Sequence, residues 1–158
     1  MTRKELQKIA VTRLKEAKVL YDTSLYDGAV YLCGYVVEAA LKARICKHLQ
    51  MKEYLDTGDM KSVFLSHDFD RLLFLSGLKN RINLANRRGT DLFKNWSLLT
   101  TWTPDMRYAS VGTYDQQYAA DLIKALEDNR DGFLIWIKKY RWQPTVSPIR
   151  FKVVNLKL

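Results

Sequence analysis

Apolar side chains recur at every third or fourth position over residues 4–21, which predicts an amphipathic helix with an outer face of Lys and Glu. A short polar segment, residues 22–28, then supplies turn and cap residues. Residues 26–49 are apolar on more than one side. A helix of that kind contacts several neighbours at once, so we expect it at the centre of the fold.

The middle of the chain has weaker periodicity. Ser66 is the expected N-cap of a short helix that runs to about Ser76. A further helical segment is expected over residues 79–99, and the Gly89-Thr-Asp sequence predicts a division into two pieces. The middle is therefore expected to hold short helices.

Three elements are predicted for the last third of the chain. Residues 101–108 are expected to be extended, because Pro104 disfavours helix at Thr103 and the neighbours are β-branched or aromatic. A long helix is expected over residues 115–140. The partial alternation in residues 149–158, after Pro144 and Pro148, resembles an edge strand.

Together these elements predict an all-α protein, an up-down bundle of four to five helices. The bundle is expected to occupy residues 1–142, and residues 143–158 to form an irregular C-terminal tail that is extended or strand-like. At 158 residues, the chain fits one domain that can bury a core without metal or disulfide.

The formal charge of +9 is concentrated in two regions, around residues 79–94 and residues 138–157. Such a field favours encounters with phosphates or with an acidic protein. A solvated basic surface that only aids solubility is the alternative reading.

The positions of the cysteines argue against a disulfide bond and a zinc site. Cys33 and Cys46 lie 13 positions apart on one predicted helix, so about 20 Å separates them and they do not pair. No cluster of Cys and His indicates zinc, and we predict neither a metal nor a cofactor. No export signal or membrane span is evident, so a cytoplasmic protein without membrane contact is expected.

One face of the second helix carries an unusual mixture. Tyr31, Tyr35, Glu38 and Lys42 fall at helical spacing on that face. Gly34 lies among them although glycine lowers helix propensity by about 1 kcal/mol relative to alanine. We therefore expect another element to approach this helix closely, most simply a crossing helix.

Four segments in order allow a family to be named. Residues 9–17 and 26–42 resemble the first two helices of the HEPN domain family, helical proteins associated in prokaryotes with nucleotidyltransferases and RNA-cutting toxins. Residues 66–73 resemble its short third helix. Residues 102–108 resemble the segment that delivers an Arg-Tyr pair before the last helix.

The resemblance implies a homodimer in which the second and last helices line a shared cleft. Active family members carry an arginine followed after four to six residues by a histidine. The arginine corresponds to Arg107, but the histidine positions hold Gly112, Thr113 and Tyr114. The unperturbed pKa of tyrosine is about 10, so Tyr114 is a poor substitute for an imidazole as general base.

The candidate site residues are Tyr31, Tyr35, Glu38, Arg107 and Tyr108 as cleft or ligand-binding residues, with Arg107 and Tyr114 as catalytic candidates. In one reading Glu38 meets Arg107 and directs its guanidinium toward a phosphate. In the other, Glu38 forms a surface ion pair with Lys42. The tyrosines either stack on bases or pack in the core or dimer interface.

The first functional hypothesis is a homodimeric HEPN-like module that binds a nucleotide, RNA or a nucleotidyltransferase partner without cutting RNA. An alternative is a toxin-type, metal-independent RNA endonuclease that uses Arg107 and an atypical second group. Another alternative is a purely structural protein-interaction domain.

Overall fold

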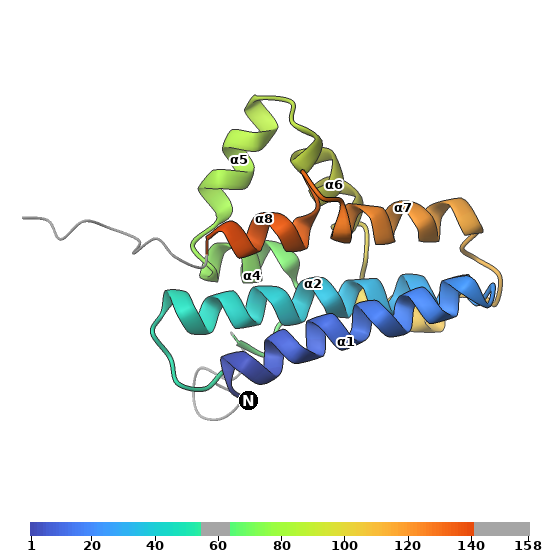
Figure 1. Ribbon diagram of the computed structural model, residues 1–158, viewed down its shortest axis with the longest axis horizontal. Coiled ribbons are helices and arrows are strands. Elements are labelled where there is room, and N and C mark those ends of the chain that lie inside the picture. Colours follow the sequence, from blue (N-terminus) through green and yellow to red (C-terminus); the bar gives the residue numbers. More distant parts are fainter. Residues whose placement is uncertain (55–63, 141–158) are drawn as a thin grey trace, which may run out of the picture.

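A computed structural model describes residues 1–54 and 64–140 of the chain, and over these ranges the protein is all-α as predicted (Figure 1). The elements are α1 (Arg3–Asp22), α2 (Tyr26–His48), α4 (Phe69–Leu75), α5 (Lys79–Arg87), α6 (Asp91–Leu99), the 3-10 helix η1 (Pro104–Tyr108), α7 (Gln116–Glu127) and α8 (Phe133–Lys139). The two long N-terminal helices match the predicted ranges.

Helices α1 and α2 form an antiparallel pair, which is the most extensive helix packing in the structure (Figure 1). A capping box starts α1: the Thr2 hydroxyl accepts from the Glu5 amide, and the Glu5 carboxylate accepts from the Thr2 amide. The chain turns between the helices at Ser24, whose φ is +61°. The short turn makes the two helices direct neighbours.

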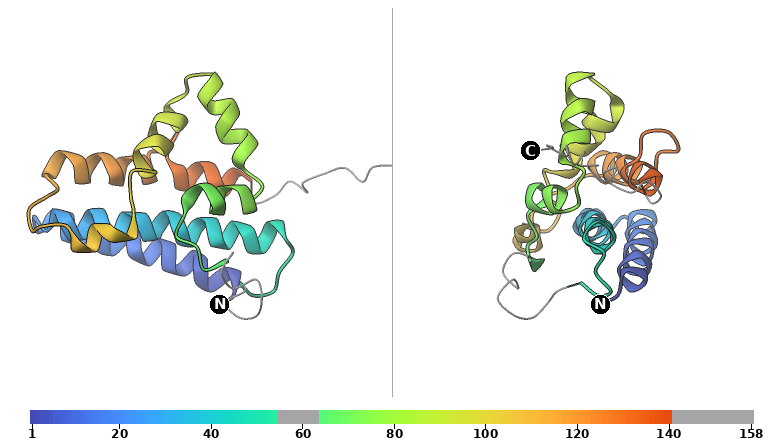
Figure 2. Two further views of the ribbon diagram at one scale, coloured as in Figure 1. Left: turned by 180° about the vertical axis from the view of Figure 1, so that it is seen from behind. Right: turned by 90° about the vertical axis from the view of Figure 1, so that its left-hand side faces the viewer.

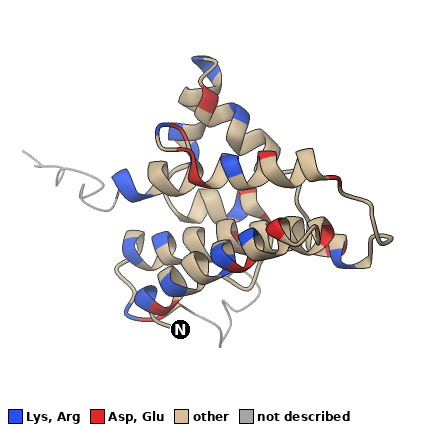
Figure 3. Cartoon of the chain, turned by 45° about the vertical axis from the view of Figure 1, so that its right-hand side comes forward, with Lys and Arg blue, Asp and Glu red and all other residues tan. Residues whose placement is uncertain are grey.

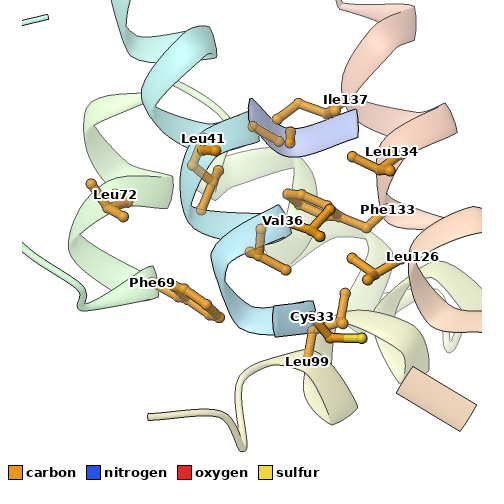
Figure 4. Close-up of a cluster of buried hydrophobic side chains, with 14 of the residues drawn as sticks. Cys33, Val36, Leu41, Phe69, Leu72, Leu99, Leu126, Phe133, Leu134 and Ile137 are labelled. Atoms are coloured by element: carbon orange, nitrogen blue, oxygen red, sulfur yellow. The ribbon is translucent and has the colours of Figure 1, made fainter. Parts of the chain in front are cut away.

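Helix α2 is the central helix, as its apolar sequence predicts. It lies between α1 and α4 in the end-on view of Figure 2, and it also packs against α7 and α8. Phe69 and Leu72 of α4 approach it from one side, while Leu126 and Phe133 approach from the other (Figure 4). Because nearly every face of α2 meets a neighbour, its few polar side chains are placed with little freedom.

The cap of α4 differs from the sequence prediction. Asp68 is the N-cap, and its carboxylate accepts from the amides of Asp70 and Arg71. Ser66 instead accepts from the Asp68 amide, so it stabilises the turn before the cap. A carboxylate two positions later satisfies two amides and carries the charge that the helix dipole favours, which explains why Asp68 takes the cap.

The predicted division of residues 79–99 is confirmed. Helix α5 ends before Gly89, which has φ of +61°, and Thr90 caps α6 through its hydroxyl. The glycine takes the left-handed conformation that ends the helix.

Two predictions for the last third were wrong. Residues 104–108 form a 3-10 helix instead of an extended segment, because Pro104 sits in its first turn, where its missing N–H is not needed. Thr103, just before it, is extended as predicted. The long helix is broken into α7 and α8, since the Asp128 carboxylate accepts from the Arg130 and Asp131 amides and so holds a turn.

The expected tail, residues 143–158, lies outside the described residues. Within residues 1–54 and 64–140, no helix is long and apolar enough to cross a membrane.

Candidate functional site

The close approach predicted at Gly34 is made by Trp102, which follows α6. A Cβ at Gly34 would lie 1.9 Å from the indole of Trp102, so no larger residue fits there. The indole N–H also donates to the carbonyl oxygen of Tyr31 at 3.0 Å. A side chain rather than a crossing helix therefore explains Gly34, and it fixes the start of η1 against α2.

Tyr31 and Tyr35 lie side by side on α2, with their hydroxyl oxygens 2.9 Å apart. The ring of Tyr35 packs edge-on against Trp102. Burial, followed by the hydrogen bond to Tyr31, raises the pKa of Tyr35 to about 12. Tyr35 is therefore a neutral hydrogen-bonding group near pH 7.

Glu38 is buried, with 7% of its surface exposed. Its two carboxylate oxygens accept from Lys42 Nζ at 2.6 Å and from His67 Nδ1 at 2.7 Å. The pair with Lys42 is thus a buried interaction rather than the surface pair considered from sequence. Arg107 forms no ion pair with Glu38, so the structure does not make the direct contact proposed for those two residues.

His67 is a member of the site that sequence reasoning missed. It lies just before α4 and is 29 positions from Glu38, so only the tertiary fold brings the two together. Because a carboxylate only accepts, Nδ1 of His67 donates to Glu38, and Nε2 is the remaining nitrogen. The His67 side chain is about half exposed, at 48%.

His67 also lines a groove of about 590 Å³ between α4, α6 and the start of η1. Aromatic side chains form much of the wall, which also includes Pro104, three positions before Arg107. The lining includes His67, Phe69, Trp96, Thr100, Trp102 and Pro104. The groove therefore joins His67 to the 3-10 helix that carries Arg107.

Arg107 is exposed on η1 and lies over the ring of Tyr108, with its guanidinium carbon 4.7 Å from the ring centroid. Hydrogen bonding to the side chains of Tyr108 and then Tyr31 raises the pKa of Arg107. No carboxylate neutralises it among the described residues. The positive charge of Arg107 and some of the five N–H donors of its guanidinium group therefore face solvent.

Asp27 positions the loop that follows Arg107, a role that the sequence did not indicate. Its carboxylate accepts from the Gly112 amide at 2.6 Å and from the Tyr114 amide at 2.9 Å. Gly112 has φ of +81°, which favours glycine. Two of the three positions where a family histidine would stand are thus held through their backbone.

The side chain of Tyr114 packs against α7. Its ring stacks on Tyr118 with the centroids 5.3 Å apart. Burial, and then the charges of Tyr118 and Asp27, raise the pKa of Tyr114. These effects work against its use as a general base.

The structure thus brings two groups together on one side of α2. Tyr31, Tyr108 and Arg107 form the first group, and Tyr35, Glu38 and His67 form the second. The hydroxyl contact between Tyr31 and Tyr35 links them. Among the described residues, no cluster of three or more His, Cys, Asp or Glu side chains could hold a metal ion.

The fold and the candidate site define a small helical module with an exposed arginine and tyrosines beside its central helix. The HEPN domain family matches residues 4–128, most of the chain, so the protein belongs to the HEPN family. No curated protein and no solved structure matches the chain. HEPN domains commonly form dimers.

Proposed function

We propose that this HEPN domain binds the phosphate group of a nucleotide or of RNA at Arg107 and does not cut it. The observation that carries the proposal is the exposed guanidinium of Arg107, which lies over the ring of Tyr108 and pairs with no carboxylate in residues 1–54 and 64–140. A fork of donors in a fixed orientation is suited to bidentate contact with phosphate oxygens.

Tyr108 supports the proposal because 76% of its surface is exposed next to that guanidinium. A base attached to a phosphate on Arg107 can stack on such a ring, and stacking accepts any base. The net charge of +9 favours the encounter.

The test is the affinity of a fluorescently labelled single-stranded RNA of about 10 nucleotides, measured by anisotropy. Arg107→Ala is expected to weaken binding about tenfold, since it removes a charge-assisted contact. Arg88→Ala is the matched control, because Arg88 is also an exposed arginine but caps α5. Equal affinity of the Arg107 variant and the Arg88 variant would contradict the proposal.

The proposal includes a homodimer in the cytoplasm, with a nucleotidyltransferase-type protein as a further partner, as in toxin–antitoxin pairs. The family's tendency to dimerise supports the first part. Light scattering after size-exclusion chromatography tests it: the dimer predicts about twice the 18.5 kDa chain mass.

A second candidate function is RNA cleavage, which the contact between His67 and Glu38 favours. In this reaction Nε2 of His67 would take the proton of a 2′-hydroxyl. The 2′-oxygen would then bond to phosphorus while the bond from phosphorus to the 5′-oxygen breaks, water protonating the leaving oxygen. Arg107 would stabilise the charge on the phosphate.

A gel assay for a 2′,3′-cyclic phosphate product separates this candidate from binding alone. Cleavage predicts that His67→Ala abolishes the product while RNA affinity changes less than with Arg107→Ala. Intact RNA after prolonged incubation with the unmodified protein contradicts cleavage and leaves binding as the function.

A further inference from the structure

A buried arginine at the other end of α2 has no counter-charge among the residues that the structure describes. Arg44 is 7% exposed, and its Nε is buried without a hydrogen-bond partner. No ion pair joins it to any carboxylate in residues 1–54 and 64–140. Burying an unpaired charge is expensive, so an arginine in this state calls for an anion.

A second arginine lies close by instead of an acid. Burial, and then the charge of Arg81 on α5, lower the pKa of Arg44. The Arg81 guanidinium is itself held over the ring of Tyr140, with its carbon 4.3 Å from the ring centroid. The positive charge of Arg81 thus adds to the cost of keeping Arg44 charged instead of offsetting it.

Three nearby segments of the chain hold no acidic residue that could neutralise Arg44. The segments 39–52, 71–90 and 132–140 contain no Asp or Glu. Burial, and then the charge of Arg44, lower the pKa of His48. The ring of His48 packs against Gly77 in the turn before α5. Figure 3 shows Lys and Arg gathered at this end, where α2 and α8 finish.

We propose that Arg44 and Arg81 form a second anion-binding site, specific for a phosphate group and separate from the one at Arg107. Two guanidinium groups present the planar donor forks that match phosphate oxygens. A bound phosphate would remove the repulsion between the arginines and satisfy the buried Nε of Arg44. Tyr31, which contacts Arg107, precedes Arg44 by 13 positions, or about 20 Å along α2.

The first test is thermal unfolding of the full chain as inorganic phosphate is added at constant ionic strength. The melting temperature should rise in a saturable way, as expected for a ligand that binds the folded state. The rise should be reduced in Arg81→Ala and in Arg44→Gln to the part that phosphate binding at Arg107 supplies. Arg107→Ala should keep the part due to Arg44 and Arg81, and Arg88→Ala should keep the full rise. Because Arg81 is exposed, its variant should fold even where Arg44→Gln does not.

The source of the phosphate is decided by a second measurement, the affinity for single-stranded RNA of about 10 nucleotides. If the site takes the RNA backbone, Arg81→Ala weakens RNA binding about tenfold. If it takes a free phosphate, RNA affinity stays unchanged while the response to inorganic phosphate is reduced. Both results support the site. No saturable rise in the unmodified protein, or a full rise in Arg81→Ala, would overturn it, whatever the outcome at Arg107.

Discussion

Two buried charges on α2, Glu38 and Arg44, lie six positions apart and have opposite surroundings. Glu38 accepts from both Lys42 and His67. The charge of Arg81, by contrast, acts on Arg44, and the buried Nε of Arg44 has no hydrogen-bond partner in the described part of the chain. Both are 7% exposed, so burial does not distinguish them. A buried charge with hydrogen-bonding partners, such as Glu38, stabilises one arrangement of the fold. A buried charge without such partners, such as Arg44, gains stability if it binds an ion of opposite charge.

The largest expected effect comes from removing the satisfied charge. Glu38→Ala leaves Lys42 buried without its counter-charge and releases His67. We expect the free energy of unfolding to fall by about 3–5 kcal/mol, as measured by urea denaturation. The double variant Glu38→Ala with Lys42→Met should recover part of the loss. A single variant as stable as the unmodified protein would show that Glu38 is not a structural anchor.

The next largest expected effect comes from disturbing the contact between Gly34 and Trp102, which positions η1 beside α2. Gly34→Ala places a methyl group where the Trp102 indole lies. Overpacking should lower the free energy of unfolding by about 2–3 kcal/mol, although alanine favours the helix. Gly89→Ala is a useful comparison, because a Cβ there meets nothing within 4 Å. Alanine at position 89 is destabilised only by the backbone strain of a φ of +61°. A larger cost at Gly89 than at Gly34 would contradict this account.

Removing the unsatisfied charge should have the opposite sign. Arg44→Met keeps an aliphatic side chain and removes the buried cation. In phosphate-free buffer we expect the free energy of unfolding to be unchanged or to rise by about 1–2 kcal/mol, again from urea denaturation. A loss as large as that of Glu38→Ala would mean that Arg44 has a partner in the folded protein.

The smallest expected effect is a pH dependence at the same end of α2. Burial, and then the charge of Arg44, lower the pKa of His48 below its ordinary value. The unfolded chain therefore binds a proton more readily than the folded one, so stability is complete above about pH 6.5 and falls as pH drops below it. His48→Gln should flatten this part of the stability curve. An unchanged slope would assign the dependence to another group.

The local parts of the fold could be predicted from the sequence. The stripes of α1 and α2 and the division at Gly89 depend on neighbouring residues, and each was confirmed. The break between α7 and α8 was missed because a local competitor, the Asp128 turn, outweighs a continuing apolar stripe. Pro104 was taken to favour an extended segment over residues 101–108, whereas it begins a 3-10 helix.

The site was predicted only in part. Helical spacing gave the row of Tyr31, Tyr35 and Glu38, and the family resemblance gave Arg107. His67 and Asp27 were missed because their partners lie 29 and 85 or more positions away, and no periodic pattern reports such contacts. The same limit applies to Arg44, whose lack of a counter-charge is visible only once its neighbours are known.

The most direct test of phosphate binding is an NMR titration that follows the arginine Nε–Hε signals as single-stranded RNA is added. Each signal reports one guanidinium, so Arg107, Arg44 and the control Arg88 can be compared in one sample. The account predicts that the Arg107 signal shifts in a saturable way while the Arg88 signal stays in place. RNA binding that leaves the Arg107 signal unmoved would contradict it.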